Sequence, residues 1–92
     1  MTPEDASKRE QEVFRGQQAK QVVDNPIYKE AFILIKAQLL SGFEATGADQ
    51  DEERREIWRT IKNLNKLEDQ IKFVMETGEM AKKSLMKKVF NQ

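Results

Sequence analysis

The stretch "IWRTIKNLNKLEDQIKFVMETGEM", residues 57–80, decides the fold because its apolar residues recur at steps of three and four. The pattern is formed by Ile57, Ile61, Leu64, Leu67, Ile71 and Val74. At about 100° per residue, these side chains occupy an arc of roughly 140°, as on a helix with one apolar face. Beyond Gly78 the register continues, with Ala81 and Leu85 at or within the margins of the same arc. These spacings predict one long helix over residues 49–90.

Charged residues at both ends of this segment favour a continuous helix. Acids gather at its start and lysines at its end: Asp49, Asp51, Glu52 and Glu53, then Lys82, Lys83, Lys87 and Lys88. This arrangement matches the sign of the helix macrodipole. Asp49, followed by Glu52 three residues later, resembles a capping pair. A different interpretation ends the helix at Gly78, acting as a C-cap, and begins a short helix near Met80.

A second helix is predicted over residues 26–43. Asp24 or Asn25 can accept hydrogen bonds from the first amides of a helix, and Pro26 suits the first turn, where its missing N–H costs nothing. The loop that follows contains two glycines and is expected over residues 44–48.

A third helix is predicted over residues 6–23, which contain good helix formers, although Gly16 weakens it. Residues 1–6 are expected to be disordered. No stretch of the chain keeps the strict alternation of apolar and polar residues that a half-buried strand needs. The expected fold class is therefore all-α: an antiparallel hairpin of a kinked N-terminal helix pair against one long C-terminal helix.

Composition excludes several classes of protein. A chain of 92 residues is at most one domain with a thin core, so its helical surfaces tend to need a partner. The 16 basic and 16 acidic side chains balance, and there is no Cys for disulfides and no His for general-base catalysis. The longest apolar run, "AFILI", is too short to span a bilayer, and the charged N-terminus does not resemble a signal peptide. We expect a soluble intracellular protein.

The predicted hairpin packs the stripe of the long helix against the helix over residues 26–43. The expected intramolecular core consists of Phe32, Ile35, Leu39, Ile57, Ile61, Leu64, Ile71 and Val74. Leu64 and Ile71 lie in the middle of this seam.

Four further apolar side chains fall outside the seam. Ile33 and Leu40 lie seven residues apart on the opposite side of their helix, and Trp58 and Phe73 lie beyond the edge of the stripe. Scattered exposed apolar residues are normal, but aromatic residues framed by charge are also typical of interfaces. We expect these four residues to form an oligomer interface in a dimer or, as a second form, a ring.

The carboxylates show no catalytic or metal-binding pattern. Glu52, Glu53 and Glu56 have no accompanying His and are typical of a solvated helix start. Glu68 and Asp69 point about 100° apart on a helix, and Glu68 is expected to pair with a lysine. We expect no catalytic residues, no metal and no cofactor, and therefore not an enzyme.

The segment "MAKKSLMKKVF", residues 80–90, is a basic amphipathic helix. Its lysines, Lys82, Lys83, Lys87 and Lys88, are a candidate anion-binding set for nucleic-acid phosphates, an anionic membrane surface or an acidic partner. The alternative is a helix end capped by lysines and docked on the acidic N-terminal segment. Because net charge is zero, nucleic acid is a weaker candidate partner than protein, and no membrane partner is expected.

Three motifs carry a resemblance to a known family. They are the Asn25-Pro26 helix start followed by Glu30, Ala31 and Phe32, the Arg55-Glu56-x-Trp58 stretch, and Glu76-Thr77-Gly78. In these motifs, over roughly residues 19–83, the chain resembles a family of short, mostly uncharacterised helical proteins of tailed bacteriophages, often encoded among head and packaging genes. The loop "GFEATGADQD" departs from the family's pattern, which tends to have a Trp and a Pro there.

The resemblance implies a small virion-assembly or packaging accessory that self-associates and binds a larger phage or host protein. Its implied location is the cytoplasm of the infected bacterial host, or the virion. Two other functions stay open. One is a DNA-binding subunit similar to small terminase subunits, although no helix-turn-helix is readable. The other is an inhibitor of a host defence or host enzyme.

Overall fold

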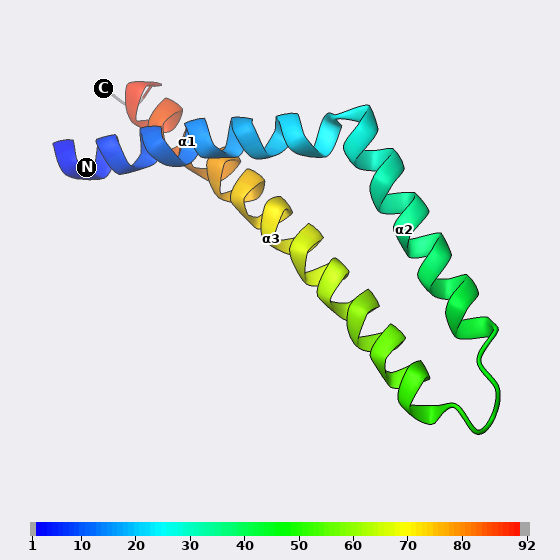
Figure 1. The fold of residues 1–92 in the computed structure, drawn as a ribbon. Coiled ribbons are helices and arrows are strands. Elements are labelled where there is room, and N and C mark those ends of the chain that lie inside the picture. The colour runs from blue at the N-terminus through cyan, green and yellow to red at the C-terminus, as the bar shows by residue number, and fades with distance from the viewer. Residues whose placement is uncertain (1, 91–92) are drawn as a thin grey trace. The chain divides into compact units, whose positions relative to one another are not determined.

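The structure, a computed structural model, describes residues 2–90 and consists of three helices (Figure 1). They are α1 (Pro3–Asp24), α2 (Pro26–Glu44) and α3 (Asp51–Phe90). Within the described residues there is no strand, so the predicted all-α fold class is confirmed.

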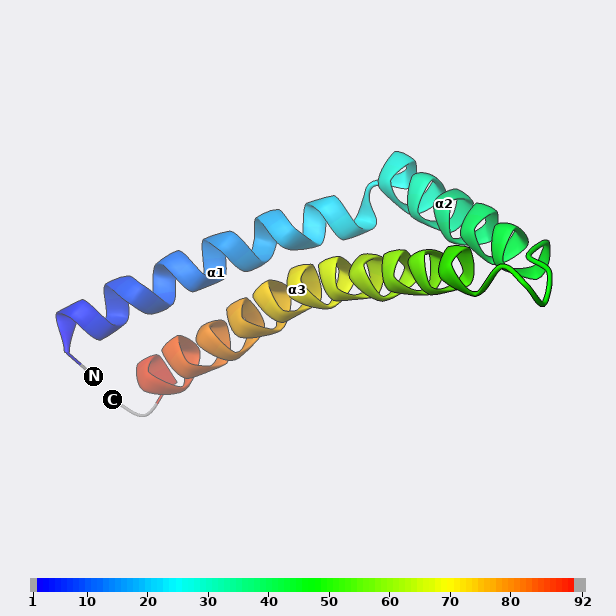
Figure 2. The ribbon, with the colours of Figure 1, turned by 60° about the horizontal axis from the view of Figure 1, so that its bottom comes forward.

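Two compact units divide the helices between them. The α1 unit contains α1 and the part of α3 from Gln70 onward. The α2 unit, Asn25–Asp69, contains α2, the loop and the first half of α3. The long helix thus packs on α2 with its first half and on α1 with its second half. Within the α1 unit, α1 and the C-terminal half of α3 cross each other in Figure 1 and lie next to each other in the turned view of Figure 2.

The first helix begins earlier than the sequence analysis predicted. The Asp5 amide donates to the Thr2 hydroxyl at 3.1 Å, and the Thr2 amide donates to the Asp5 carboxylate at 3.5 Å. This is a reciprocal capping box with Pro3 in the first turn. The hydrogen bonds from Thr2 lower the pKa of Asp5 because they favour its charged form. The prediction that residues 1–6 are disordered is therefore wrong for residues 3–6, which belong to α1.

Asn25 is the residue that separates α1 from α2. Its backbone is extended (φ −66°, ψ 124°), and its side-chain oxygen accepts hydrogen bonds from the amides of Ile27 at 2.9 Å and Tyr28 at 3.2 Å. Of the two candidate caps, Asn25 and not Asp24 therefore starts α2, and Pro26 occupies its first turn as predicted. At the other end, the Thr46 hydroxyl donates to the Phe43 carbonyl at 2.6 Å and terminates the helix.

The third helix begins two residues later than predicted, at Asp51. The Gln50 amide donates to the Gly47 carbonyl at 3.1 Å, so Asp49 lies within a turn and is not the cap. Gln50 precedes the helix instead, because its carbonyl accepts the first helical hydrogen bond, from the Arg54 amide at 3.1 Å.

Beyond this start, α3 is continuous for 40 residues. The alternative that ended the helix at Gly78 is wrong. None of the described glycines has a positive φ, so Gly78 does not adopt the left-handed conformation of a helix-ending glycine.

The α2 unit holds its two helix segments together by partly exposed contacts. The Arg54 guanidinium lies 5.0 Å from the centre of the Phe43 ring, and the Lys36 ammonium lies 3.6 Å from the Glu68 carboxylate. The expected pairing of Glu68 with a lysine is confirmed. Because both charged groups of this pair are about one-third exposed, the pair contributes about 0 to 1 kcal/mol and fixes orientation more than stability.

The predicted intramolecular core is only partly enclosed. Seven of its residues are half-buried: Phe32, Leu39, Ile57, Ile61, Leu64, Ile71 and Val74. Ile35 is 43% exposed and lies outside the core, contrary to the prediction. Apolar residues surround α2 on most sides, while only one neighbouring helix packs on it in its unit, so periodicity could not identify the packed side.

Ile71 and Val74 also differ from the prediction in their partner. They belong to the unit of α1, not to that of α2. Val74 lines a groove together with Glu12 and Arg15 of α1. The reason is length: α2 has 19 residues and α3 has 40, so α2 covers only the first half of the apolar stripe.

We expect Leu64→Ala and Ile71→Ala each to lower the free energy of unfolding by about 1 to 2 kcal/mol, because both side chains are half-buried and lose only part of the transfer free energy of a core residue. Leu64 reports on the α2 unit and Ile71 on the α1 unit. Urea unfolding followed by circular dichroism measures both. Lys66→Ala, on an exposed part of α3, is the control and should change stability by less than about 0.5 kcal/mol. Two unchanged urea unfolding curves would show that neither side chain packs on a neighbouring helix.

Candidate interaction surfaces

Two glycines mark the closest approach of helices in the α1 unit. A Cβ placed on Gly16 would lie 2.8 Å from the Gly78 Cα atom, and a Cβ placed on Gly78 would lie 2.8 Å from both the Gly16 Cα atom and the Glu12 carbonyl oxygen. Both glycines are buried and lie inside helices. Because real Cβ atoms do not approach backbone this closely, only glycine allows this contact.

Ala81 extends the crossing by one turn of α3 from Gly78. It is 1% exposed, and among the hydrophobic residues whose exposure the structure describes it is the one that is buried. A crossing made by small residues brings two backbones together and gains dispersion contacts, but it buries little apolar area. The α1 unit is thus positioned by close backbone packing more than by a hydrophobic core.

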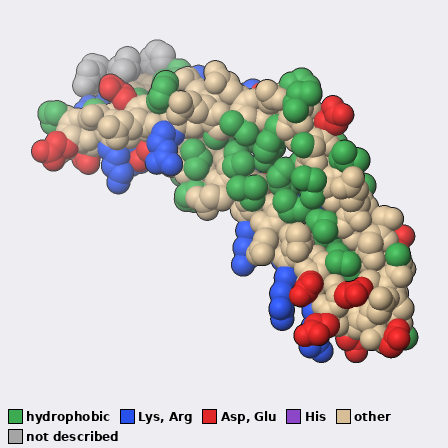
Figure 3. Space-filling model, in the orientation of Figure 1, with side chains coloured by type: hydrophobic (Ala, Val, Ile, Leu, Met, Phe, Trp, Pro, Cys, Tyr) green, Lys and Arg blue, Asp and Glu red, His purple; other side chains and the backbone are tan. Residues whose placement is uncertain are grey.

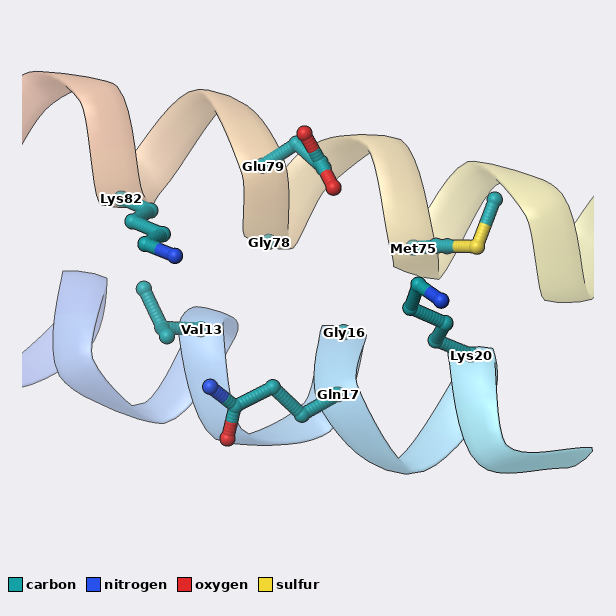
Figure 4. A pocket seen from close by; sticks show the side chains of 8 residues that line it. All are labelled: Val13, Gly16, Gln17, Lys20, Met75, Gly78, Glu79 and Lys82. Carbon is teal, nitrogen blue, oxygen red and sulfur yellow. The ribbon is translucent and has the colours of Figure 1, made fainter.

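A groove of about 250 Å³ runs beside this crossing, lined by Val13, Gly16, Gln17, Lys20, Met75, Gly78, Glu79 and Lys82 (Figure 4). Lys20 from α1 and Lys82 from α3 enter it from opposite sides. The Lys20 ammonium donates to the Asp24 carboxylate at 2.7 Å, and this hydrogen bond, together with the charges of Asp24 and Glu79, raises the pKa of Lys20. The Lys20 ammonium already has acidic neighbours in Asp24 and Glu79, so it does not make the groove a preformed anion-binding site.

This crossing was not predicted from the sequence, where Gly16 was interpreted as a weak point of a helix and Gly78 as a possible end of one. The available signal was the placement of each glycine in the interior of an otherwise helical segment, with an alanine three residues further on in both cases: Ala19 after Gly16 and Ala81 after Gly78. Since glycine costs a helix interior about 1 kcal/mol, its use there indicates a packing constraint.

Large apolar side chains are exposed on the surface of all three helices. All three helices contribute large residues that are at least 43% exposed: Phe14, Val22, Ile27, Ile33, Leu34, Ile35, Leu40, Trp58, Leu67, Phe73, Met80 and Met86. No residue of α2 is buried, although α2 is the most apolar of the three helices. Figure 3 shows hydrophobic side chains at the surface along α2, and acidic side chains clustered around the loop.

The four residues predicted for an oligomer interface are all exposed in the single chain. Ile33 is 70% exposed, Leu40 53%, Trp58 54% and Phe73 61%. Ile33, Leu40 and Trp58 belong to the α2 unit, whereas Phe73 belongs to the α1 unit. The Lys62 ammonium lies 5.4 Å from the centre of the Trp58 ring. The exposure of these side chains is compatible with an interface, and the interface itself stays a prediction.

The predicted anion-binding lysines lie near the end of α3. Lys82, Lys83 and Lys87 are exposed, and Lys88 is half-buried and has an interaction partner. Lys82 also lines the groove beside the glycine crossing. The lysines therefore do not form a single exposed row.

No family model, curated protein or solved structure matches the chain. Among the described residues, no group of three or more acidic side chains is placed to hold a metal ion. None of the described helices combines the length and the apolar character needed to cross a membrane.

Proposed function

We propose that this protein is a non-enzymatic helical protein that acts by protein–protein association, first with copies of itself and then with a larger partner. One observation carries the proposal. The described residues bury a single alanine among their hydrophobic side chains, while α2 exposes Ile27, Ile33, Leu34 and Leu40 by half or more. Exposed apolar surface on this scale marks an interaction site, because a monomer gains nothing from leaving it in water.

The sequence resemblance supports a specific setting for this association. A virion-assembly or packaging accessory of a tailed bacteriophage would work in the infected cell or in the virion, and it would need both self-association and a larger phage or host partner. A small protein whose surface is completed by other copies suits such a role.

The proposal is tested by measuring the mass of the wild-type protein in solution by light scattering. We expect a dimer, or a ring as a second form, at tens of micromolar. A monomer over this range would contradict self-association. Recovery of a specific partner from infected cells, lost when the exposed apolar residues of α2 are made polar, would support the second step.

DNA binding is a second candidate, favoured by the exposure of Lys82, Lys83 and Lys87 near the end of α3. If it is correct, binding to duplex DNA should weaken by about 0.9 log unit per log unit of salt for each phosphate neutralised. Changing these three lysines to glutamine should then abolish binding. The control variant changes three lysines in the middle of α3 to glutamine and so removes the same amount of charge: Lys62, Lys66 and Lys72. No measurable binding at low salt would remove this candidate.

A further inference from the structure

A row of exposed residues follows one side of α2. It consists of Lys29, Ile33, Ala37, Leu40 and Glu44, all exposed, and is called the α2 stripe below. Each of its members directly follows a half-buried residue of the side that packs on α3: Tyr28, Phe32, Lys36, Leu39 and Phe43. Consecutive helical residues point about 100° apart, so the α2 stripe lies beside the packed side and not on it.

The order of chemical types along the α2 stripe is self-complementary. A cation stands at one end, Lys29, and an anion at the other, Glu44, with Ile33, Ala37 and Leu40 between them. In a parallel pair of α2 helices, like charges would meet at both ends. In an antiparallel pair, Lys29 meets Glu44 of the second copy and Ile33 meets its Leu40, while the small Ala37 lies beside the symmetry axis.

We propose that a second copy of this chain binds the α2 stripe with its own α2 stripe, antiparallel and related by a two-fold axis close to Ala37. This inference rests on the proposed function and specifies its partner and register. A two-fold contact of one patch with itself closes without leaving a free binding surface. The apolar residues supply the affinity, and the two Lys29 to Glu44 contacts set the direction.

The length of the contact limits its strength. From Lys29 to Glu44 the stripe is roughly 24 Å long at 1.5 Å per residue. One helix pair of this length buries less than a standard protein interface, so a dissociation constant on the order of micromolar is expected.

Charge reversal tests the register. Lys29→Glu and Glu44→Lys each place like charges opposite each other twice in the dimer, and each should weaken association about tenfold. Both changes suit the macrodipole of α2, because they put an acid in its first turns and a base in its last turn, so weaker association cannot follow from a weaker helix. Mixing the two variants should restore association, since both end contacts of the mixed dimer are then attractive. The control is Lys66→Glu, which reverses the charge of an exposed residue of α3 and should not change the strength of association.

A second measurement is independent of charge. The chain has no cysteine, so a single one can be placed without background. Ala37→Cys should be linked to a dimer by a short bifunctional maleimide. Gln38→Cys, also exposed but one residue further round the helix, should not be linked. Analytical ultracentrifugation reports the charge variants, and denaturing electrophoresis reports the linked dimer.

The outcomes separate the two proposals. A wild-type monomer at tens of micromolar would overturn both. A wild-type oligomer that is insensitive to both charge reversals and is not linked through Ala37→Cys would overturn the antiparallel α2 contact alone and leave self-association through another surface. Weakening by each single reversal with recovery on mixing, together with linking at Ala37→Cys alone, would support the contact.

Discussion

Gly16→Ala should lower the free energy of unfolding of the α1 unit by about 1 to 2 kcal/mol, although alanine is the better helix former by up to about 1 kcal/mol. The added methyl group would lie 2.8 Å from the Gly78 Cα atom, and it would meet backbone that cannot turn aside as a flexible side chain can. The helices must then separate, and the contacts around Ala81 are lost. Gly78→Ala should act in the same direction, because its methyl group would meet both Gly16 and the Glu12 carbonyl.

Gly42→Ala is the matched control for this prediction. It is also a glycine within a helix, but a Cβ there would lie 3.7 Å from the Ile57 Cδ1 atom, which is an ordinary contact. Its substitution should raise stability by up to about 1 kcal/mol, through helix propensity and a less flexible unfolded chain. Urea unfolding at one fixed protein concentration compares the three variants. If Gly16→Ala and Gly78→Ala also stabilise the protein, the close helix crossing does not exist in solution.

The double variant Ile33→Glu with Leu40→Glu should abolish self-association while keeping the helical circular dichroism. Both side chains are more than half exposed in the single chain, so the carboxylates remain solvated when it is alone. In an oligomer they would be buried without partners, at a cost of at least about 3 kcal/mol, or about a hundredfold in dissociation constant. Light scattering at tens of micromolar measures the loss of mass.

Ile27→Glu tests whether this effect is specific to the predicted surface. Ile27 is 70% exposed, as Ile33 is, and lies on the same helix. Ile33 lies six positions after Ile27, so at about 100° per residue the two side chains point about 120° apart. Ile27→Glu should leave the mass unchanged. An oligomer that survives the double variant, or one that Ile27→Glu also disrupts, would show that Ile33 and Leu40 do not define the interface.

The start of α2 and the continuity of α3 were predictable because their causes are local. Asn25 and Pro26 marked the start of α2 by capping chemistry alone, and the three- and four-residue spacing carried α3 through Gly78. The early start of α1 was equally local but was overlooked, because Thr2 and Asp5 form a capping box within a segment that is otherwise merely charged.

The contacts between helices were less predictable because they depend on which residues lie opposite each other. Periodicity assigned Ile35 to the core, yet an apolar helix that packs on one neighbour has no pattern to show which side is enclosed. The meeting of Gly16 and Gly78 likewise requires the register between two distant segments. The residue types of the α2 stripe could be read from the sequence, but only the structure shows that the stripe lies beside the side of α2 that packs on α3.

Among the hydrophobic residues whose exposure the structure describes, Ala81 is the one that is buried, and this has a calorimetric consequence. Unfolding raises the heat capacity chiefly by exposing apolar surface to water, normally by about 12 to 15 cal/mol/K per residue. The large apolar side chains whose exposure the structure describes are exposed or only half-buried in the single chain, so unfolding exposes less new apolar surface and the heat-capacity increment should be smaller than this. In the proposed oligomer, further apolar surface is buried when the copies assemble. We therefore expect the melting temperature to rise with protein concentration, as for any native state that is stabilised by binding.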